Sequence, residues 1–347
     1  MSGDATLAAL VEREHADWDD PVVSRAVFGT TAPDAIAATI QVWLHAGLGA
    51  RAARARFYRA SVGCVAGVDL DDGRSVVLKA QRSRRSAAHF ESCHVVRRHL
   101  ADAGFPCPRP LGEPLRRDDV FITFEVLSEE GDRADAHDPL IRTALAASLA
   151  EMVSLARPLV SSTRLGRAWF TAVPDDRLWP RPHSPRFDFE RTGEGAEWID
   201  AIAQRARAAR TRSSGEVVIG HFDWRVEHAR FDPSGRVVAT YDWDSLHAEL
   251  EPVLVGANAH AFTADWQRSD LVRAPSLDEI LAFEQAYETA RGEPFTRDER
   301  ALARASCVYS LAYTARCSHA LRPAEEGWNG DFRPLLRNSA HALLADA

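Results

Sequence analysis

Three strand-like segments joined by short turns place the strongest limit on what this chain can fold into. The segments span residues 55–61, 64–70 and 74–80, with Gly63 in the first connection and the turn sequence DDG in the second. Connections this short join neighbouring antiparallel strands. We therefore expect an antiparallel meander, with Lys79 on its third strand, in an otherwise largely helical chain.

The remaining pattern divides the chain into three parts. Residues 1–50 have a helical apolar rhythm, and a helix followed by a strand completes the sheet-forming region. The polar sequence SEEGDRADAHD then marks a boundary after residue 127. We predict an α+β protein with a helical extension over 1–50, an N-terminal lobe over 51–127 and a mostly helical C-terminal lobe over 128–347. Further helices are expected over 32–48, 86–104, 139–156 and about 194–210, with capping boxes Ser276-x-x-Glu279 and Thr296-x-x-Glu299 opening two more.

Composition excludes several classes of protein. The net charge of −8 argues against general nucleic-acid binding. Apolar runs are too short to predict a membrane span, and the N-terminus lacks the layout of a signal peptide. Five cysteines include no C-x-x-C pair, which favours reduced thiols over a disulfide framework or zinc site. We expect a cytoplasmic protein with no nucleic-acid or membrane partner.

Lys79 is the only lysine among the 42 lysine and arginine residues. On a solvated surface the two residue types are nearly interchangeable, so a bias toward arginine can remove lysine there. A compact ammonium is harder to replace where a point charge must meet phosphates. The position of Lys79 on a sheet therefore indicates a functional role.

A polar cluster follows a strand-like run in the second half of the chain. The sequence HFDWRVEH covers residues 221–228, and YDWD ends at Asp244. A hairpin around the turn DPSG is expected to bring His228 close to Asp242, with Asp223 in the preceding loop. A loop carboxylate such as Asp223 can accept a proton from a hydroxyl. A carboxylate at a strand end such as Asp242 can hold Mg²⁺ beside nucleotide phosphates.

These residues, in this order, resemble the aminoglycoside phosphotransferase family, which has a bilobal protein-kinase-like fold. The family loop H-x-D-x4-N corresponds to His221, Asp223 and, at the asparagine position, His228. The family sequence D-W-[DE] corresponds to 242–244. The resemblance implies a small-molecule kinase in which ATP or GTP, with Mg²⁺, donates its γ-phosphate to a hydroxyl, with Asp223 as catalytic base. Arg225 could stabilise the transferred phosphoryl group, although an exposed arginine is the more ordinary interpretation.

The resemblance also implies a nucleotide site in the N-terminal lobe. Lys79 matches the strand lysine that contacts the α- and β-phosphates, and Gly63 lies in the loop that would cover them. Glu91 is the nearest acidic residue in the helix that should supply a partner for Lys79, although the register places that partner nearer Cys93. The hinge falls near 124–127, so Glu125 and Leu127 are candidates for nucleotide contacts.

His228 departs from the family pattern, because imidazole is a poorer ligand than an amide oxygen for Mg²⁺. Three explanations are open: one metal rather than two, tolerance for Mn²⁺, or a protonated His228 that contacts phosphoryl oxygens. The third predicts activity that changes steeply near a pH of ~6.5. His221 is expected to hold the loop by hydrogen bonds to the backbone, and Asp244 either to fix the loop or to contact the metal.

Two other functions compete with the kinase. The His and Asp residues could form the metal site of a hydrolase, which leaves Lys79 without a role. A nucleotide-binding relative without activity is the third possibility. The acceptor could be an antibiotic, an amino sugar or an amino alcohol. Its wall could include Trp169, Trp179 and His183, and an acidic pocket for amines could include Glu249, Glu251 and Asp265.

Overall fold

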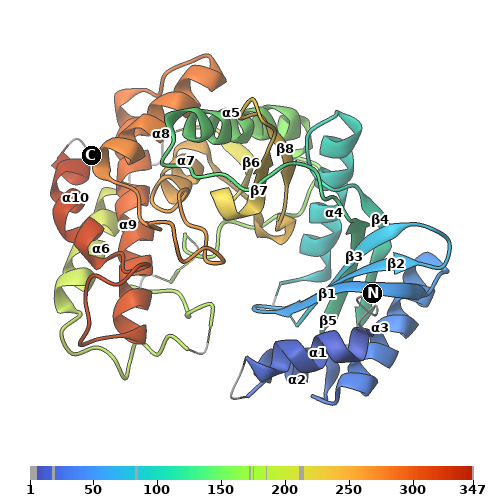
Figure 1. Cartoon of the computed structure of the whole chain (residues 1–347). Coiled ribbons are helices and arrows are strands. Elements are labelled where there is room, and N and C mark those ends of the chain that lie inside the picture. Colours follow the sequence, from blue (N-terminus) through green and yellow to red (C-terminus); the bar gives the residue numbers. More distant parts are fainter. Residues whose placement is uncertain are drawn as a thin grey trace. The chain divides into compact units, whose positions relative to one another are not determined.

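The computed structural model describes residues 6–17, 20–82, 85–171, 173–174, 176–184, 186–210 and 215–345. The chain forms two compact units (Figure 1). The first comprises Met1–Asp102 and Cys107–Glu129, and the second comprises Ala103–Pro106 and Glu130–Ala347. Each unit has its own buried core.

The first unit is built on a five-stranded sheet with the order β1-β2-β3-β5-β4. Its strands are β1 (Ala52–Ala60), β2 (Cys64–Leu70), β3 (Ser75–Arg82), β4 (Pro110–Arg117) and β5 (Val120–Val126). All of the pairings are antiparallel, and β1–β3 form the expected meander. The strand β4 was not expected, because its sequence contains two prolines, which are uncommon within strands.

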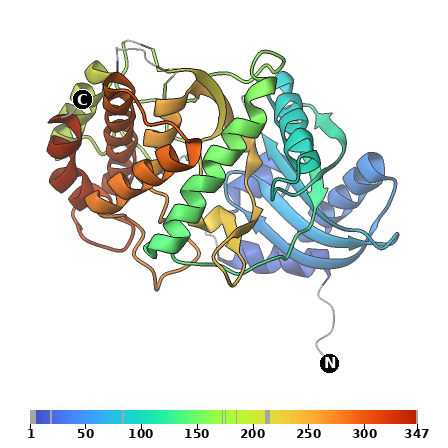
Figure 2. The ribbon, with the colours of Figure 1, turned by 90° about the horizontal axis from the view of Figure 1, so that it is seen from above.

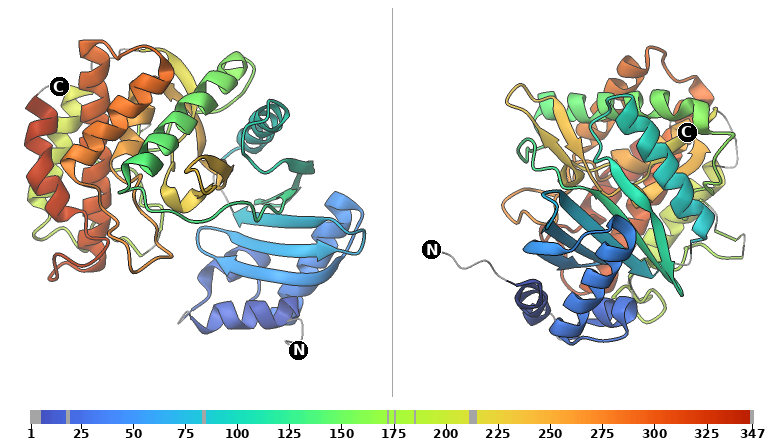
Figure 3. Two further views of the ribbon diagram at one scale, coloured as in Figure 1. Left: turned by 45° about the horizontal axis from the view of Figure 1, so that its top comes forward. Right: turned by 90° about the vertical axis from the view of Figure 1, so that its right-hand side faces the viewer.

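Alternation of side chains gives this sheet two different faces. One face packs on α1 (Leu7–Ala16), α2 (Val22–Phe28) and α3 (Pro33–Leu48), with Val76, Leu78 and Ala80 of β3 in the shared core (Figure 3). The opposite face contacts α4 (Ala87–Asp102), where the ring of Phe90 stacks on that of Phe121 at 4.3 Å. Because successive residues of a strand point to opposite faces, Lys79 lies on the α4 face.

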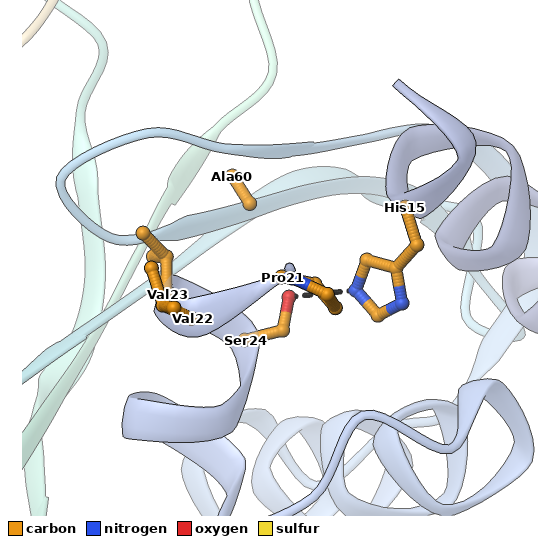
Figure 4. A pocket seen from close by; sticks show the side chains of 6 residues that line it. All are labelled: His15, Pro21, Val22, Val23, Ser24 and Ala60. Atoms are coloured by element: carbon orange, nitrogen blue, oxygen red, sulfur yellow. Dashed lines mark hydrogen bonds between the residues drawn. The ribbon is translucent and has the colours of Figure 1, made fainter. Parts of the chain in front are cut away.

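A shallow hollow lies where α1 and α2 meet β1. It is lined by His15, Pro21, Val22, Val23, Ser24 and Ala60 (Figure 4). The buried Ser24 hydroxyl lies 2.8 Å from His15 Nε2 and 3.0 Å from the Tyr58 hydroxyl. These contacts tie two helices of the N-terminal extension to the sheet.

The second unit is mostly helical. Its longest helix, α9 (Arg297–Leu321), packs against α6 (Glu197–Ala209), α7 (Glu251–Ala259) and α10 (Arg333–Ala345) (Figure 2). The helix α5 (Pro139–Ala156) packs against α8 (Leu277–Arg291). Both capping boxes are confirmed, with Ser276 opening α8 and Thr296 opening α9.

Two small antiparallel sheets lie within this helical unit. The strand β6 (Val217–His221) pairs with β9 (Leu246–Leu250), and β7 (Ala229–Phe231) pairs with β8 (Val237–Thr240).

The short segment 103–106 also belongs to this unit. The ring of Phe105 meets that of Trp243 edge-on at 5.9 Å, and Thr240 donates to the carbonyl of Pro106 at 2.7 Å.

One helical segment differs from the expectation about membrane spans. Pro139–Leu159 is long and apolar enough to cross a membrane by length and composition, and half of its most apolar window is buried inside the unit. A helix in the core of a globular unit has the same composition, because one of its faces must be apolar. The segment is therefore weak evidence for a span.

Candidate functional site

The end of β6 is organised around the side chain of His221, which is fully buried. Its Nδ1 accepts a hydrogen bond from the backbone N–H of Asp223 at 3.2 Å, so Nε2 carries the proton and donates to the carbonyl of Tyr241 at 3.2 Å. Burial lowers the pKa of His221 to about 4. This neutral imidazole links the loop after β6 to the segment that carries Asp242, as expected.

A second buried residue, Asn258 of α7, holds the same loop. Its Oδ1 accepts from the backbone N–H of Trp224 at 2.9 Å, and its Nδ2 donates to the carbonyl of His221 at 2.9 Å. The indole of Trp224 donates to the carbonyl of Leu145 at 2.8 Å. Asn258 was not predicted, because its only signal is a lone amide in the largely apolar sequence EPVLVGANA.

Asp223 and Arg225 form a close ion pair. Arg225 Nε lies 2.6 Å from Asp223 Oδ1, and Nη2 donates to Oδ2 at 3.0 Å. Burial alone would raise the pKa of the Asp223 carboxyl, but the charge of Arg225 and its hydrogen bond more than offset this and hold the pKa well below its usual range. The Arg225 side chain is only 16% exposed and also pairs with Glu227 at 3.1 Å. The interpretation of Arg225 as an ordinary surface arginine was therefore wrong.

The protonation of His228 follows from its two neighbours. Nδ1 donates to the backbone carbonyl of Asp223 at 2.9 Å, and Nε2 accepts from Arg225 Nη2 at 3.3 Å. A carbonyl only accepts and a guanidinium only donates, so the ring is neutral with its proton on Nδ1. Nε2 also lies 3.8 Å from Oδ2 of Asp242.

Asp242 follows β8 in the left-handed region, with φ 64° and ψ 45°. This conformation is uncommon for a residue other than glycine and concentrates at functional sites. The hairpin is fixed on both sides, because Tyr241 N–H donates to the carbonyl of His228 at 2.8 Å and the Trp243 indole donates to the carbonyl of Thr240. Side-chain ligand atoms of Asp223, His228 and Asp242 lie within 4.8 Å of one another.

The candidate nucleotide residues lie in the first unit. The ammonium of Lys79 lies 3.3 Å from Glu125 Oε1 on β5, whereas Glu91 is exposed on α4. The proposed pairing of Lys79 with Glu91 is thus wrong. Helical periodicity buries Phe90, Cys93 and Arg97 against the rest of the unit and turns residue 91 to solvent.

The backbone limits the roles of Leu127 and Gly63, the other two candidates for nucleotide contacts. The Leu127 N–H donates to the carbonyl of Ser75 at 2.9 Å, so a nucleotide could contact only the carbonyl or side chain of Leu127. A Cβ atom at residue 63 would lie 2.8 Å from the carbonyl oxygen of Ala80. Close packing on β3 is therefore a sufficient reason for Gly63.

The acidic residues considered for an amine pocket are used in internal ion pairs. Glu249 pairs with Arg167 at 3.1 Å, Glu251 pairs with Arg291 at 3.2 Å and Asp265 pairs with Arg133 at 2.7 Å. All three carboxylates are buried. Each negative charge is therefore offset by an arginine of the same unit.

The aromatic candidates do converge. The rings of Trp169, Trp179 and His183 each contact Tyr313 of α9, with centroids 4.8, 6.1 and 5.9 Å away. A further pair of rings, Phe170 and Phe222, lies 5.7 Å apart and connects this group to the residue next to Asp223. We call Trp169, Trp179, His183 and Tyr313 the aromatic group.

Comparison with known proteins places the chain in a family. A sequence profile described as "Phosphotransferase enzyme family" matches residues 68–250, more than half of the chain. The chain belongs to this family and is a small-molecule phosphotransferase. No curated protein sequence matched the chain.

Solved structures share the fold at low sequence identity. An amicoumacin kinase, hAmiN, in complex with AMP-PNP, Ca²⁺ and Ami is 10% identical with a TM-score of 0.57, covering 84% of this chain and 88% of that one. A thermostable mutant of aminoglycoside phosphotransferase APH(4)-Ia, in ternary complex with ADP and hygromycin B, is 13% identical with a TM-score of 0.56, covering 89% and 99%. An aminoglycoside phosphotransferase from Alicyclobacillus acidocaldarius is 15% identical with a TM-score of 0.50, covering 87% and 94%. The predicted protein-kinase-like fold is confirmed.

Proposed function

We propose that this phosphotransferase moves the γ-phosphate of ATP or GTP to a hydroxyl group of a small molecule. Asp223 is the catalytic base that aligns this hydroxyl and accepts its proton. The observation that carries the proposal is the cluster of Asp223, Arg225, His228 and Asp242 at the ends of β6 and β8. Support for the nucleotide comes from the similar structures, whose complexes contain AMP-PNP or ADP.

Asp223 is suited to orient a hydroxyl. Arg225 keeps its carboxylate ionised at neutral pH, and His221 and Asn258 fix the surrounding backbone. A carboxylate with a low pKa is a weak base, so its contribution is to align the hydroxyl and to receive the proton late in the transfer. Phosphoryl transfer depends mostly on positioning and charge stabilisation, which is what this arrangement offers.

His228 and Asp242 fit a divalent cation. Their facing atoms, Nε2 and Oδ2, are 3.8 Å apart, which is too far for a hydrogen bond and suitable for two ligands of one ion. A cation bound there would have to displace Arg225, whose Nη2 lies within hydrogen-bond distance of both His228 Nε2 and Asp223 Oδ2. A bound Mg²⁺ would neutralise charge on the phosphates. The neutral ring of His228 supports a ligand role over a protonated contact to phosphate, and a nitrogen ligand is more favourable for Mn²⁺ than for Mg²⁺.

Lys79 is proposed to contact the α- and β-phosphates, and the backbone around Glu125 and Leu127 to contact the base. The aromatic group is proposed to form one wall of the acceptor site, because Phe170 and Phe222 connect it to Asp223. The metal-dependent hydrolase is less well supported, since it leaves Lys79 and its ion pair with Glu125 without a role.

The proposal is tested by calorimetric titration of ATP and of GTP, with and without Mg²⁺ or Mn²⁺. The wild type, Lys79→Ala and Asp242→Asn are compared with Glu293→Gln, which removes an exposed carboxylate of the second unit. We expect metal-dependent binding to the wild type and the control, weakened at least tenfold in the other two. Failure of the wild type to bind either nucleotide would overturn the proposal. An acceptor screen follows, with Asp223→Asn as the inactive comparison.

A further inference from the structure

The single lysine of the chain is held by the sheet on which it lies. Lys79 of β3 is opposite Thr123 of β5, and Glu125 is two residues further along the same strand. Residues 79 and 125 are thus diagonal neighbours on one face, within reach of long side chains. The ammonium lies 3.3 Å from Glu125 Oε1, and the carboxylate is 3% exposed.

The helix α4 contributes a cation to the same carboxylate. Arg97 Nη2 donates to Glu125 Oε2 at 2.6 Å and to the carbonyl of Pro108 at 3.0 Å. Arg97 is buried, as is Glu125. One carboxylate is therefore shared by two cations, with Lys79 on one oxygen and Arg97 on the other.

This arrangement reverses the charges found in protein kinases. There the strand lysine pairs with a glutamate on the helix, and movement of that helix controls whether the pair is formed. Here the anion is on the strand next to Lys79, and the helix supplies an arginine. The α4 position nearest to the expected glutamate is Cys93, which is buried, and Glu91 points to solvent.

We propose that Glu125 is the residue that positions Lys79 for nucleotide phosphates and that Arg97 of α4 locks Glu125 in place, so the carboxylate that sets the position of Lys79 lies on the sheet and not on the helix. The proposal rests on the proposed nucleotide-binding function. The net charge of the three side chains is +1, which leaves attraction for a polyphosphate while keeping the ammonium in one place. Glu125 and Arg97 are positioning residues, because neither is proposed to touch the nucleotide through its side chain.

Because Lys79 is the only lysine, its amine can be followed without nucleotide. The measurement is the rate at which an N-hydroxysuccinimide ester acylates Lys79, resolved from the N-terminal amine by peptide mass spectrometry. Release from a carboxylate makes an amine more reactive, so Glu125→Gln should raise the rate severalfold. The matched control is Glu113→Gln, since Glu113 of β4 also pairs with an arginine of α4, Arg98, at 2.8 Å. An unchanged rate in Glu125→Gln, or a rise in Glu91→Gln instead, would overturn the proposal.

The second measurement is the Kd for ATP with a divalent cation. We expect it to rise at least tenfold in Glu125→Gln, to recover partly in Glu125→Asp and to stay unchanged in Glu113→Gln. If Glu125→Gln does not fold, the measurement uses the double variant Arg97→Met with Glu125→Gln instead, which removes two opposite charges together. Wild-type affinity in a folded Glu125 variant would refute the positioning role. A wild type that binds no nucleotide would instead refute the proposed function, while the acylation rates would still report on the ion pair.

Discussion

The burial of His221 makes the stability of the second unit depend on pH. In the unfolded chain a histidine titrates near ~6.5, whereas burial lowers the pKa of folded His221 to about 4. Between these values the unfolded chain binds a proton that the folded chain excludes. The stabilising contribution is therefore complete above about pH 6.5 and is lost as the pH falls toward 4.

The magnitude at pH 5 follows from the difference in protonation. The unfolded histidine is largely protonated there and the folded one is not. The pH lies about 1.5 units below the unfolded value, and each unit corresponds to about 1.4 kcal/mol, so His221 costs the folded state about 2 kcal/mol relative to pH 7. Glutamine at this position keeps an acceptor and a donor but does not titrate.

The assay is urea unfolding of wild type and His221→Gln at pH 7 and pH 5, in the presence of a chelator. Tryptophan fluorescence is a suitable signal, because Trp224 and Trp243 contact the His221 ring edge-on at 5.4 and 5.3 Å. The free energy of unfolding of the wild type should fall by about 2 kcal/mol more than that of the variant. The other histidines contribute equally to the pH dependence of the unfolding free energy in both proteins. Equal losses in the two proteins would refute the assignment of a buried neutral imidazole.

Two further changes test the packing of the helical unit. A Cβ atom at Gly256 would lie 1.9 Å from the carbonyl oxygen of Ala303 on α9, so Gly256→Ala should lower the free energy of unfolding by about 3 kcal/mol in urea titrations. Its control is Gly166→Ala, where nothing lies within 4 Å, and a similar loss there would contradict the packing argument. Ser276→Ala removes the side-chain acceptor of the α8 capping box and should cost about 1 kcal/mol by the same measurement; no change would mean that water replaces the cap.

Local signals in the sequence located much of the fold. Strand periodicity and turn residues predicted β2 and β3, and the two capping boxes predicted the starts of α8 and α9 at the correct residues. Pairings between distant segments were not predictable in this way. The strand β9 was missed, because its partner β6 is 25 or more residues away and neither strand has a local hairpin signal.

The site shows the same division between local and distant information. Asp223, His228 and Asp242 were found because a loop, a hairpin and their polar residues are close in sequence. The partner of Lys79 was misplaced, since the choice between Glu91 and Glu125 depends on the register of β3 with β5 and on the rotation of α4. Neither quantity is contained in the spacing of charged residues.

The division of the chain into its two units has a practical consequence for work with fragments. The chain passes between the units at three points, since residues 103–106 belong to the second unit and lie between two parts of the first. A fragment that begins at residue 130 would lack Phe105 and Pro106, which contact Trp243 and Thr240. It would thus expose an aromatic surface beside Asp242. A fused peptide carrying residues 103–106 would have to accompany such a fragment to complete its core.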